Sequence, residues 1–171
     1  MTEQRDVFYY VTLMNENYAQ PDLPAGAAAG VIAGAYLFER LGPASGPGVT
    51  LMGSGAILGE VRQAAQQLAA QGLGVDVISV TSWCELARDG QTRADACHLA
   101  RLLGSTRGPI VAATDYVRAV PESVRAFVPP GRAFATLGTD GFGRSDTRAA
   151  LRAFFSVDAE SIARLAQRAL A

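Results

Sequence analysis

The stretch VTLMGSGAILGEVRQAAQQLAAQGLGVDVISVTS, residues 49–82, decides the fold, because it alternates between the patterns of a strand and of a helix. Its two ends, residues 49–55 and 75–82, are apolar and rich in β-branched residues, which predicts two buried strands. Four residues between them recur at the i, i+3, i+4 and i+7 spacing of one helix face: Val61, Ala64, Ala65 and Leu68. Gly72 or Gly74 is the predicted stop of this helix.

The same alternation continues toward the carboxyl end. Residues 109–115 and 132–138 predict two further strands, and residues 84–104 predict a helix interrupted near Asp89 and Gly90. Strands that alternate with helices are typical of an α/β domain. We therefore expect a three-layer α/β/α fold with a mostly parallel, mixed sheet.

Capping residues and helix breakers locate the remaining helices. Asp115 is predicted to cap the helix that follows it, and Pro121 should kink or divide that helix. The last helix is predicted to begin at Asp158 and to carry a Glu160–Arg164 pair at i, i+4.

The first 48 residues do not show this regular alternation of strand and helix patterns. Residues 6–14 are aromatic and β-branched, which predicts a strand, and residues 15–26 contain two prolines and several turn-forming residues. Residues 27–41 could form a helix, although Gly30 and Gly34 would each lower its stability by about 1 kcal/mol relative to alanine.

The composition excludes several kinds of chemistry. All 15 basic residues are arginine, so the chain has no lysine for a Schiff base or a phosphate-binding P-loop. One histidine, His98, and two cysteines are a poor set for catalysis or for a zinc site. The net charge of −1 gives no general attraction to nucleic acid or to an anionic membrane. No apolar run is long enough for a membrane span, and the first residues lack the apolar core of a signal peptide. The two cysteines favour a reduced, cytoplasmic setting, and we expect no bound metal.

Two short motifs follow the first two strands of residues 49–82. GSGAIL, residues 53–58, lies where a strand meets a helix, so it is either an anion-binding turn or a tight turn with Ser54 near the helix cap. In TSWCELARDGQ, residues 81–91, Glu85 and Arg88 either belong to a binding site at the end of a strand or form an exposed ion pair.

Cys84 and His98 are predicted to have structural roles. Cys84 follows a tryptophan and is predicted to be a small buried residue. His98 is predicted to lie on a helix surface, because adjacent residues such as Cys97 and His98 do not face each other on a helix.

LGTDGFGRSD, residues 137–146, is the densest polar stretch. Its glycines permit a tight turn, and Asp140 or Asp146 can cap a helix that begins at Thr147. Arg144 could clamp a carboxylate or pair with a neighbouring domain. The residues alone leave a turn and an interface equally open.

Four motifs in order resemble one family: FYYVTLMNENYAQPDLP, TSWCELARDGQ, ATDY and LGTDGFGRSDTR. Together they resemble the C-terminal region of the homodimeric pyruvate dehydrogenase decarboxylating subunit, in the transketolase superfamily of thiamine diphosphate enzymes. The resemblance implies that residues 1–48 are the end of a middle domain plus a linker. It implies that residues 49–171 are a transketolase C-terminal-like domain.

The resemblance also implies which parts are missing. The GDG motif that binds thiamine diphosphate and Mg, the glutamate that activates the cofactor and the active-site histidines belong to the family's earlier domains. Residues 94–108 are shorter than the corresponding stretch of the family and differ from it in sequence. The resemblance therefore assigns no role to His98. We therefore expect no catalytic residue in this chain and no cofactor bound by it.

The resemblance predicts an organisational role. The parent would oxidatively decarboxylate a 2-oxo acid, with pyruvate as the expected substrate, and this chain alone would be inert. Its expected partners are the remaining domains of the subunit, a second copy in a homodimer and the acyltransferase core. In this interpretation residues 138–146 form an interdomain and dimer element, in which Phe142 packs and Asp140 and Arg144 make polar contacts.

Two further expectations remain. The chain could instead be a free-standing α/β module that binds a small anion at GSG and GFGRSD. Residues 6–14 would normally pair inside a middle domain, so they are predicted to pair with a second copy or to be poorly ordered.

Overall fold

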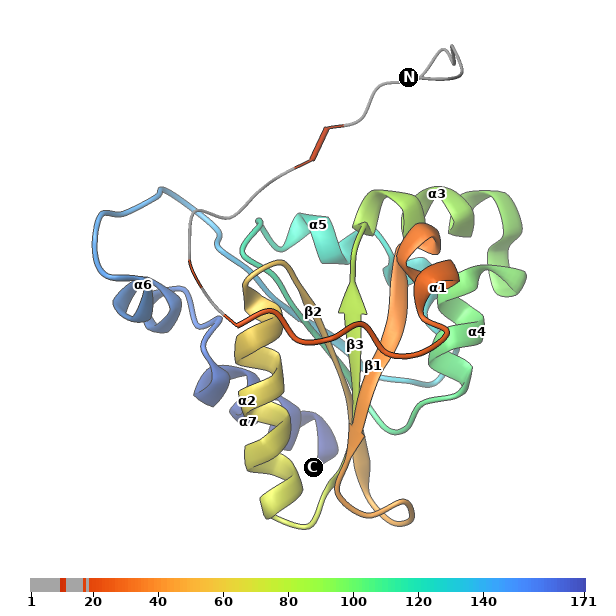
Figure 1. The fold of residues 1–171 in the computed structure, drawn as a ribbon, viewed down its shortest axis with the longest axis horizontal. Coiled ribbons are helices and arrows are strands. Elements are labelled where there is room, and N and C mark those ends of the chain that lie inside the picture. The colour runs from red at the N-terminus through yellow and green to blue at the C-terminus, as the bar shows by residue number, and fades with distance from the viewer. Residues whose placement is uncertain (1–9, 12–16, 18) are drawn as a thin grey trace.

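A five-stranded sheet forms the centre of the molecule (Figure 1), in a computed structural model that describes residues 10–11, 17 and 19–171. The strand order is β1(Ala35–Leu41), β3(Gly74–Val80), β2(Gly48–Ser54), β4(Ile110–Ala113) and β5(Phe134–Leu137). Strands β2 to β5 run parallel, and β1 pairs antiparallel with β3 at one edge. The predicted α/β class and mostly parallel mixed sheet are confirmed.

Helices cover both faces of the sheet because the central strands are buried on both sides. Valines and leucines that alternate along β2, β3 and β4 pack against α2(Ile57–Ala70) and α7(Ala159–Leu170). The intervening residues of the same strands pack against α3(Trp83–Arg93) and α4(His98–Gly104). The shorter helices are α1(Ala28–Ala33), α5(Ala119–Glu122) and α6(Arg148–Phe154). This arrangement is the predicted three layers.

Local patterns located most elements correctly. The four predicted core residues of α2 are fully buried, and Gly72 follows its end with a positive φ of 86°. The Asp158 carboxylate accepts a hydrogen bond from Ser161 N at 2.9 Å and caps α7. Glu160 and Arg164 lie 3.8 Å apart, as their spacing predicts.

The helix predicted over residues 27–41 is wrong for its second half. Gly34 has a φ of 99° and ends α1, and the chain then enters strand β1. A Cβ at Gly34 would lie 2.7 Å from Ser82 O, so the close approach of the two segments requires glycine. Since β1 pairs with β3, the sheet extends across the boundary predicted after residue 48. The strand predicted over residues 6–14 lies outside the described residues, apart from Tyr10 and Val11.

The interruption of the helix after β3 falls later than predicted. Helix α3 continues through Gly90 to Arg93, and the break comes at Ala94, whose φ is 48°. Gly90 fits inside the helix because it packs against the ring of Phe127. The predicted burial of Cys84 is wrong: Trp83 takes the core position and Cys84 is exposed.

The cap predicted at Asp115 is also wrong. Helix α5 starts after Arg118 and has no side-chain cap. Pro121 lies in this short helix, and a separate 3-10 turn follows at residues 125–127, so the segment is divided as predicted. Within the described residues, no helix has the length and apolar character needed to cross a membrane.

Candidate functional site

The loops after β4 and β5 are held together at the carboxyl edge of the sheet. Thr139 N donates to Tyr116 O at 2.9 Å, and the Thr139 hydroxyl donates to Asp115 O at 2.6 Å. A Cβ at Gly138 would lie 2.6 Å from Tyr116 O, so only glycine permits this approach. The carboxyl ends of parallel strands are where α/β proteins build their sites.

Asp140 locks the two loops in place. Its carboxylate accepts hydrogen bonds from Arg118 N at 2.8 Å and from Arg118 Nε at 2.6 Å. The backbone N–H of Arg118, followed by its side chain, lowers the pKa of Asp140 below the ordinary range of an aspartate. Asp140 makes these polar contacts within this chain, and its predicted interdomain contact stays a prediction.

The rest of the loop leads into α6. Thr147 caps this helix by accepting from Ala150 N at 3.3 Å, and Asp146 accepts from Thr147 N at 2.7 Å. Neither Asp140 nor Asp146 is the cap, so that prediction is wrong. The Arg144 guanidinium lies 4.1 Å from the centroid of the Phe154 ring, a cation–π contact.

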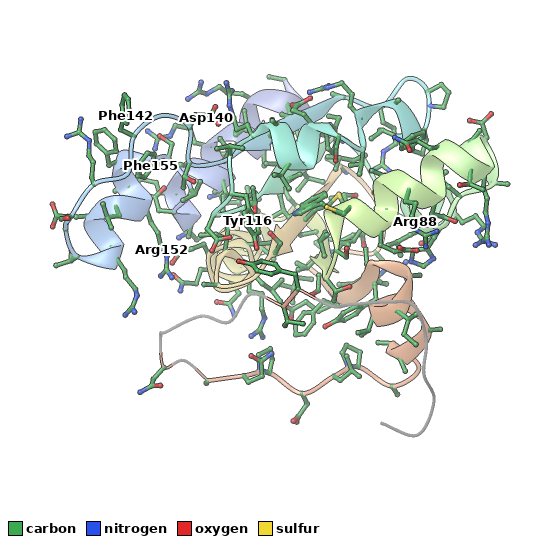
Figure 2. All side chains as sticks on the ribbon, turned by 90° about the horizontal axis from the view of Figure 1, so that it is seen from above. Arg88, Tyr116, Asp140, Phe142, Arg152 and Phe155 are labelled. Carbon is green, nitrogen blue, oxygen red and sulfur yellow. The ribbon has the colours of Figure 1, made fainter. Side chains whose placement is uncertain are left out.

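A cavity of about 380 Å³ lies between this loop, α6 and the start of α2. Four charged side chains line it: Asp115, Arg144, Arg148 and Arg152. Apolar residues line the remainder, among them Ile57, Leu151, Phe155 and Val157. Figure 2 shows Asp140, Phe142, Phe155 and Arg152 together on this side of the molecule.

Asp115 is the carboxylate of this cavity. Burial raises its pKa, which the positive charge of Arg152 partly opposes. It lies beside the turn that leads into α2, because a Cβ at Gly55 would be 3.7 Å from its Oδ1.

Ser54 is buried and hydrogen-bonded within the sheet. The residue is 6% exposed, and its hydroxyl lies 2.8 Å from the hydroxyl of Thr114, so the pair joins the ends of β2 and β4. The geometry corresponds to the tight-turn interpretation of GSG.

Glu85 and Arg88 form an exposed ion pair, the second of the two interpretations that the sequence left open for them. Two Arg88 nitrogens donate to the Glu85 carboxylate at 2.6–3.0 Å, which raises the pKa of Arg88. Figure 2 shows Arg88 on the opposite side of the molecule from Asp140 and Phe142. These two residues are therefore not brought together with Arg144.

Cys97 and His98 form no dyad. Cys97 Sγ accepts from Ala100 N at 3.4 Å and caps α4, whereas His98 Nε2 lies 2.7 Å from Ala35 O. His98 is half-buried and joins α4 to β1, so it is not a simple surface residue.

Sequence reasoning missed the support of the site. Glu60 on α2 accepts from Arg152 Nη1 and from Ala159 N, both at 3.0 Å. Glu60 therefore joins α2 to α6 and to the start of α7. The two partners lie 92 and 99 residues away in the chain, and no local spacing signals such contacts.

The arrangement is suited to recognition. In the part of the chain that the structure describes, no group of three or more His, Cys, Asp or Glu side chains could hold a metal ion. The cavity at the carboxyl edge instead presents guanidinium groups, one carboxylate and apolar side chains, which bind and orient charged partners.

Comparisons with known proteins identify a family and several relatives of this chain. Residues 34–158 match the family described as transketolase-like TK C-terminal domain. The chain is 45% identical over 181 residues to the pyruvate dehydrogenase E1 component of Pseudomonas aeruginosa. This match covers 99% of this chain and 20% of that protein. The same component of Mycobacterium tuberculosis is 40% identical over 169 residues, covering 91% of this chain and 18% of that protein. The chain thus spans about a fifth of the length of these curated relatives.

Solved structures support the fold. A transketolase from Leishmania mexicana matches with a TM-score of 0.58 at 22% identity, over 83% of this chain and 18% of that one. A split gene transketolase, described as an inactive beta4 tetramer, matches with a TM-score of 0.57 at 20% identity. That match covers 81% of this chain and 42% of that one.

Proposed function

Because this chain belongs to the transketolase-like C-terminal domain family, we propose that it is the organisational domain of a pyruvate dehydrogenase-type decarboxylating subunit. The observation that carries the proposal is its 45% identity to pyruvate dehydrogenase E1 components over 99% of its own length. The parent enzyme would oxidatively decarboxylate a 2-oxo acid, with pyruvate as its substrate. Matches to much larger proteins do not favour a free-standing module.

The cavity at the carboxyl edge does not suit the magnesium of the parent enzyme. Magnesium takes oxygen ligands, usually carboxylates, and the cavity at the carboxyl edge provides three arginines against one aspartate. We therefore derive no step of the reaction from these residues, and we expect the chain alone to be inert.

Exposed apolar residues support an interdomain role for the carboxyl edge. Phe142 is 97% exposed, and Tyr116 and Val117 on the neighbouring loop are about half exposed. The lock between Asp140 and Arg118 holds the two loops in one arrangement. A rigid edge that presents apolar side chains is typical of a surface covered by a partner. In this proposal the other domains of the subunit cover it.

Partners and location follow from the parent. The proposal includes a homodimer, contact with an acyltransferase core and a cytoplasmic location. The family match begins at residue 34 and β1 belongs to the sheet, so we propose that the connection from the preceding domain ends before residue 34.

The test is reconstitution of activity. The E1 component of Pseudomonas aeruginosa, truncated to remove the fifth that this chain matches, is mixed with this chain, and pyruvate decarboxylation is measured with thiamine diphosphate and magnesium. We expect activity in the mixture and none from this chain alone. A mixture in which the two polypeptides associate but remain inactive would contradict the proposal.

Two variants test the surface. Phe142→Ser should weaken association with the truncated enzyme, because it removes the most exposed apolar side chain of the edge. Ile32→Ser is the matched control, since Ile32 is 81% exposed on α1. Equal effects of the two substitutions would show that the carboxyl edge is not the contact surface.

A further inference from the structure

The cavity at the carboxyl edge concentrates positive charge. Arg148 and Arg152 lie at i, i+4 on α6, so they share one helix face, and Arg144 reaches the cavity from the preceding loop. Arg152 also pairs with Glu60, and the contact of Arg144 with the Phe154 ring neutralises no charge. Among the residues that line the cavity, three guanidinium groups accompany one carboxylate, that of Asp115.

The opposite wall adds to this potential. It is formed by the start of α2, where the cap residue Ala56 makes no side-chain hydrogen bond to the first turn. The amino end of a helix carries a partial positive charge, which favours an anion. The 14-residue α2 thus reinforces the arginines across the cavity.

The rest of the cavity is apolar and of small-molecule size. Ile57, Leu151, Phe155 and Val157 line it, and its volume of about 380 Å³ suits a ligand of a few carbon atoms. An occupant therefore needs an anionic group for the arginines and an apolar part for these side chains.

We propose that this cavity binds a small organic anion, a carboxylate or a phosphate ester, through the guanidinium groups of Arg144, Arg148 and Arg152. The inference goes beyond the organisational role and does not depend on it. Ser54, which the sequence suggested as an anion ligand, takes no part, since its hydroxyl pairs with Thr114.

Isothermal titration of the chain tests the proposal. The probes are butyl phosphate, butyrate and inorganic phosphate, at constant ionic strength. We expect one of the two organic anions to bind to one site and more tightly than inorganic phosphate, because the apolar wall contacts the butyl group. The stronger of the two identifies the anionic group as phosphate or carboxylate. No binding of either organic anion would overturn the proposal.

Matched arginine variants locate the site. Arg144→Gln should weaken binding by about tenfold or more, the usual effect of losing a charge-assisted hydrogen bond. Arg144 is exposed, so the variant should fold, and circular dichroism checks this. Arg88→Gln on α3 is the control with the same change of charge, at the other side of the molecule. If both variants weakened anion binding equally, the effect would come from the net charge of the protein, and the assignment of the site to this cavity would be overturned.

Asp115 supplies an independent readout. Arg148 and Arg152 from α6 and Arg144 from the loop line the same cavity as Asp115, and Arg152 also pairs with Glu60 from α2. Its carboxylate repels an anion in the cavity, so Asp115→Asn should tighten binding at neutral pH. Weaker binding by this variant would argue against an anion beside Asp115.

Discussion

At the scale of a residue, Gly90 is a position where a single added methyl group should change the stability of the fold. It lies inside α3, and a Cβ there would overlap the ring of Phe127. Gly90→Ala should lower the free energy of unfolding by about 1–3 kcal/mol, because overpacking outweighs the better helix propensity of alanine. Gly59→Ala in α2 meets nothing within 4 Å and should raise it by roughly 0.5–1 kcal/mol. Urea unfolding of both variants checks the opposite signs, and stabilisation by Gly90→Ala would refute the packing argument.

At the scale of elements, the Glu60 carboxylate holds three helices together. It is 14% exposed and accepts from Arg152 on α6 and from the first residue of α7. Glu60→Gln should lower the free energy of unfolding by about 1–2 kcal/mol, because one charged acceptor serves two donors. Glu160→Gln is the control: its side chain is 80% exposed, and the change should stay within about 0.5 kcal/mol. Thermal unfolding of the two variants tests this, and equal shifts would contradict the role of the junction.

At the scale of the whole molecule, stability should decline in acid. Hydrogen bonds from Arg125 and Thr136 lower the pKa of Glu122, and Arg118 lowers that of Asp140. Their contribution is present above the unfolded pKa of about 4 and is lost as the pH falls through the folded value. Burial raises the pKa of Asp115, so its contribution has the opposite sign and is lost as the pH rises through its folded value.

Two variants separate these opposing contributions in thermal unfolding from about pH 7 to about pH 3. Glu122→Gln should lower the unfolding midpoint at neutral pH and flatten its decline in acid. Asp115→Asn should raise the midpoint at neutral pH and steepen the decline. If the unfolding midpoint fell with pH in parallel for wild type and both variants, other groups would be responsible for the loss of stability in acid.

Within the candidate site, sequence reasoning found the loop and missed the cavity. Asp140 and Arg144 were identified because glycines and charged residues cluster around them in LGTDGFGRSD. The sequence predicts Asp115 as a helix cap, and no local pattern points to Arg148, Arg152 or Glu60. Glutamates and arginines are common on helix surfaces, so nothing in their local spacing distinguishes those that meet across a cavity.

The sequence by itself determined the alternation of strands and helices from residue 49 onward, the buried face of α2 and the cap of α7. Each depends on residues within a few positions of one another, where periodicity and capping act directly. Only the tertiary structure decided that residues 35–41 form an edge strand, that Asp140 locks onto Arg118, and that three arginines converge beside Asp115. The physical reason is that these outcomes depend on partners brought close by folding, and residues far apart in the chain carry no local sign of their contact.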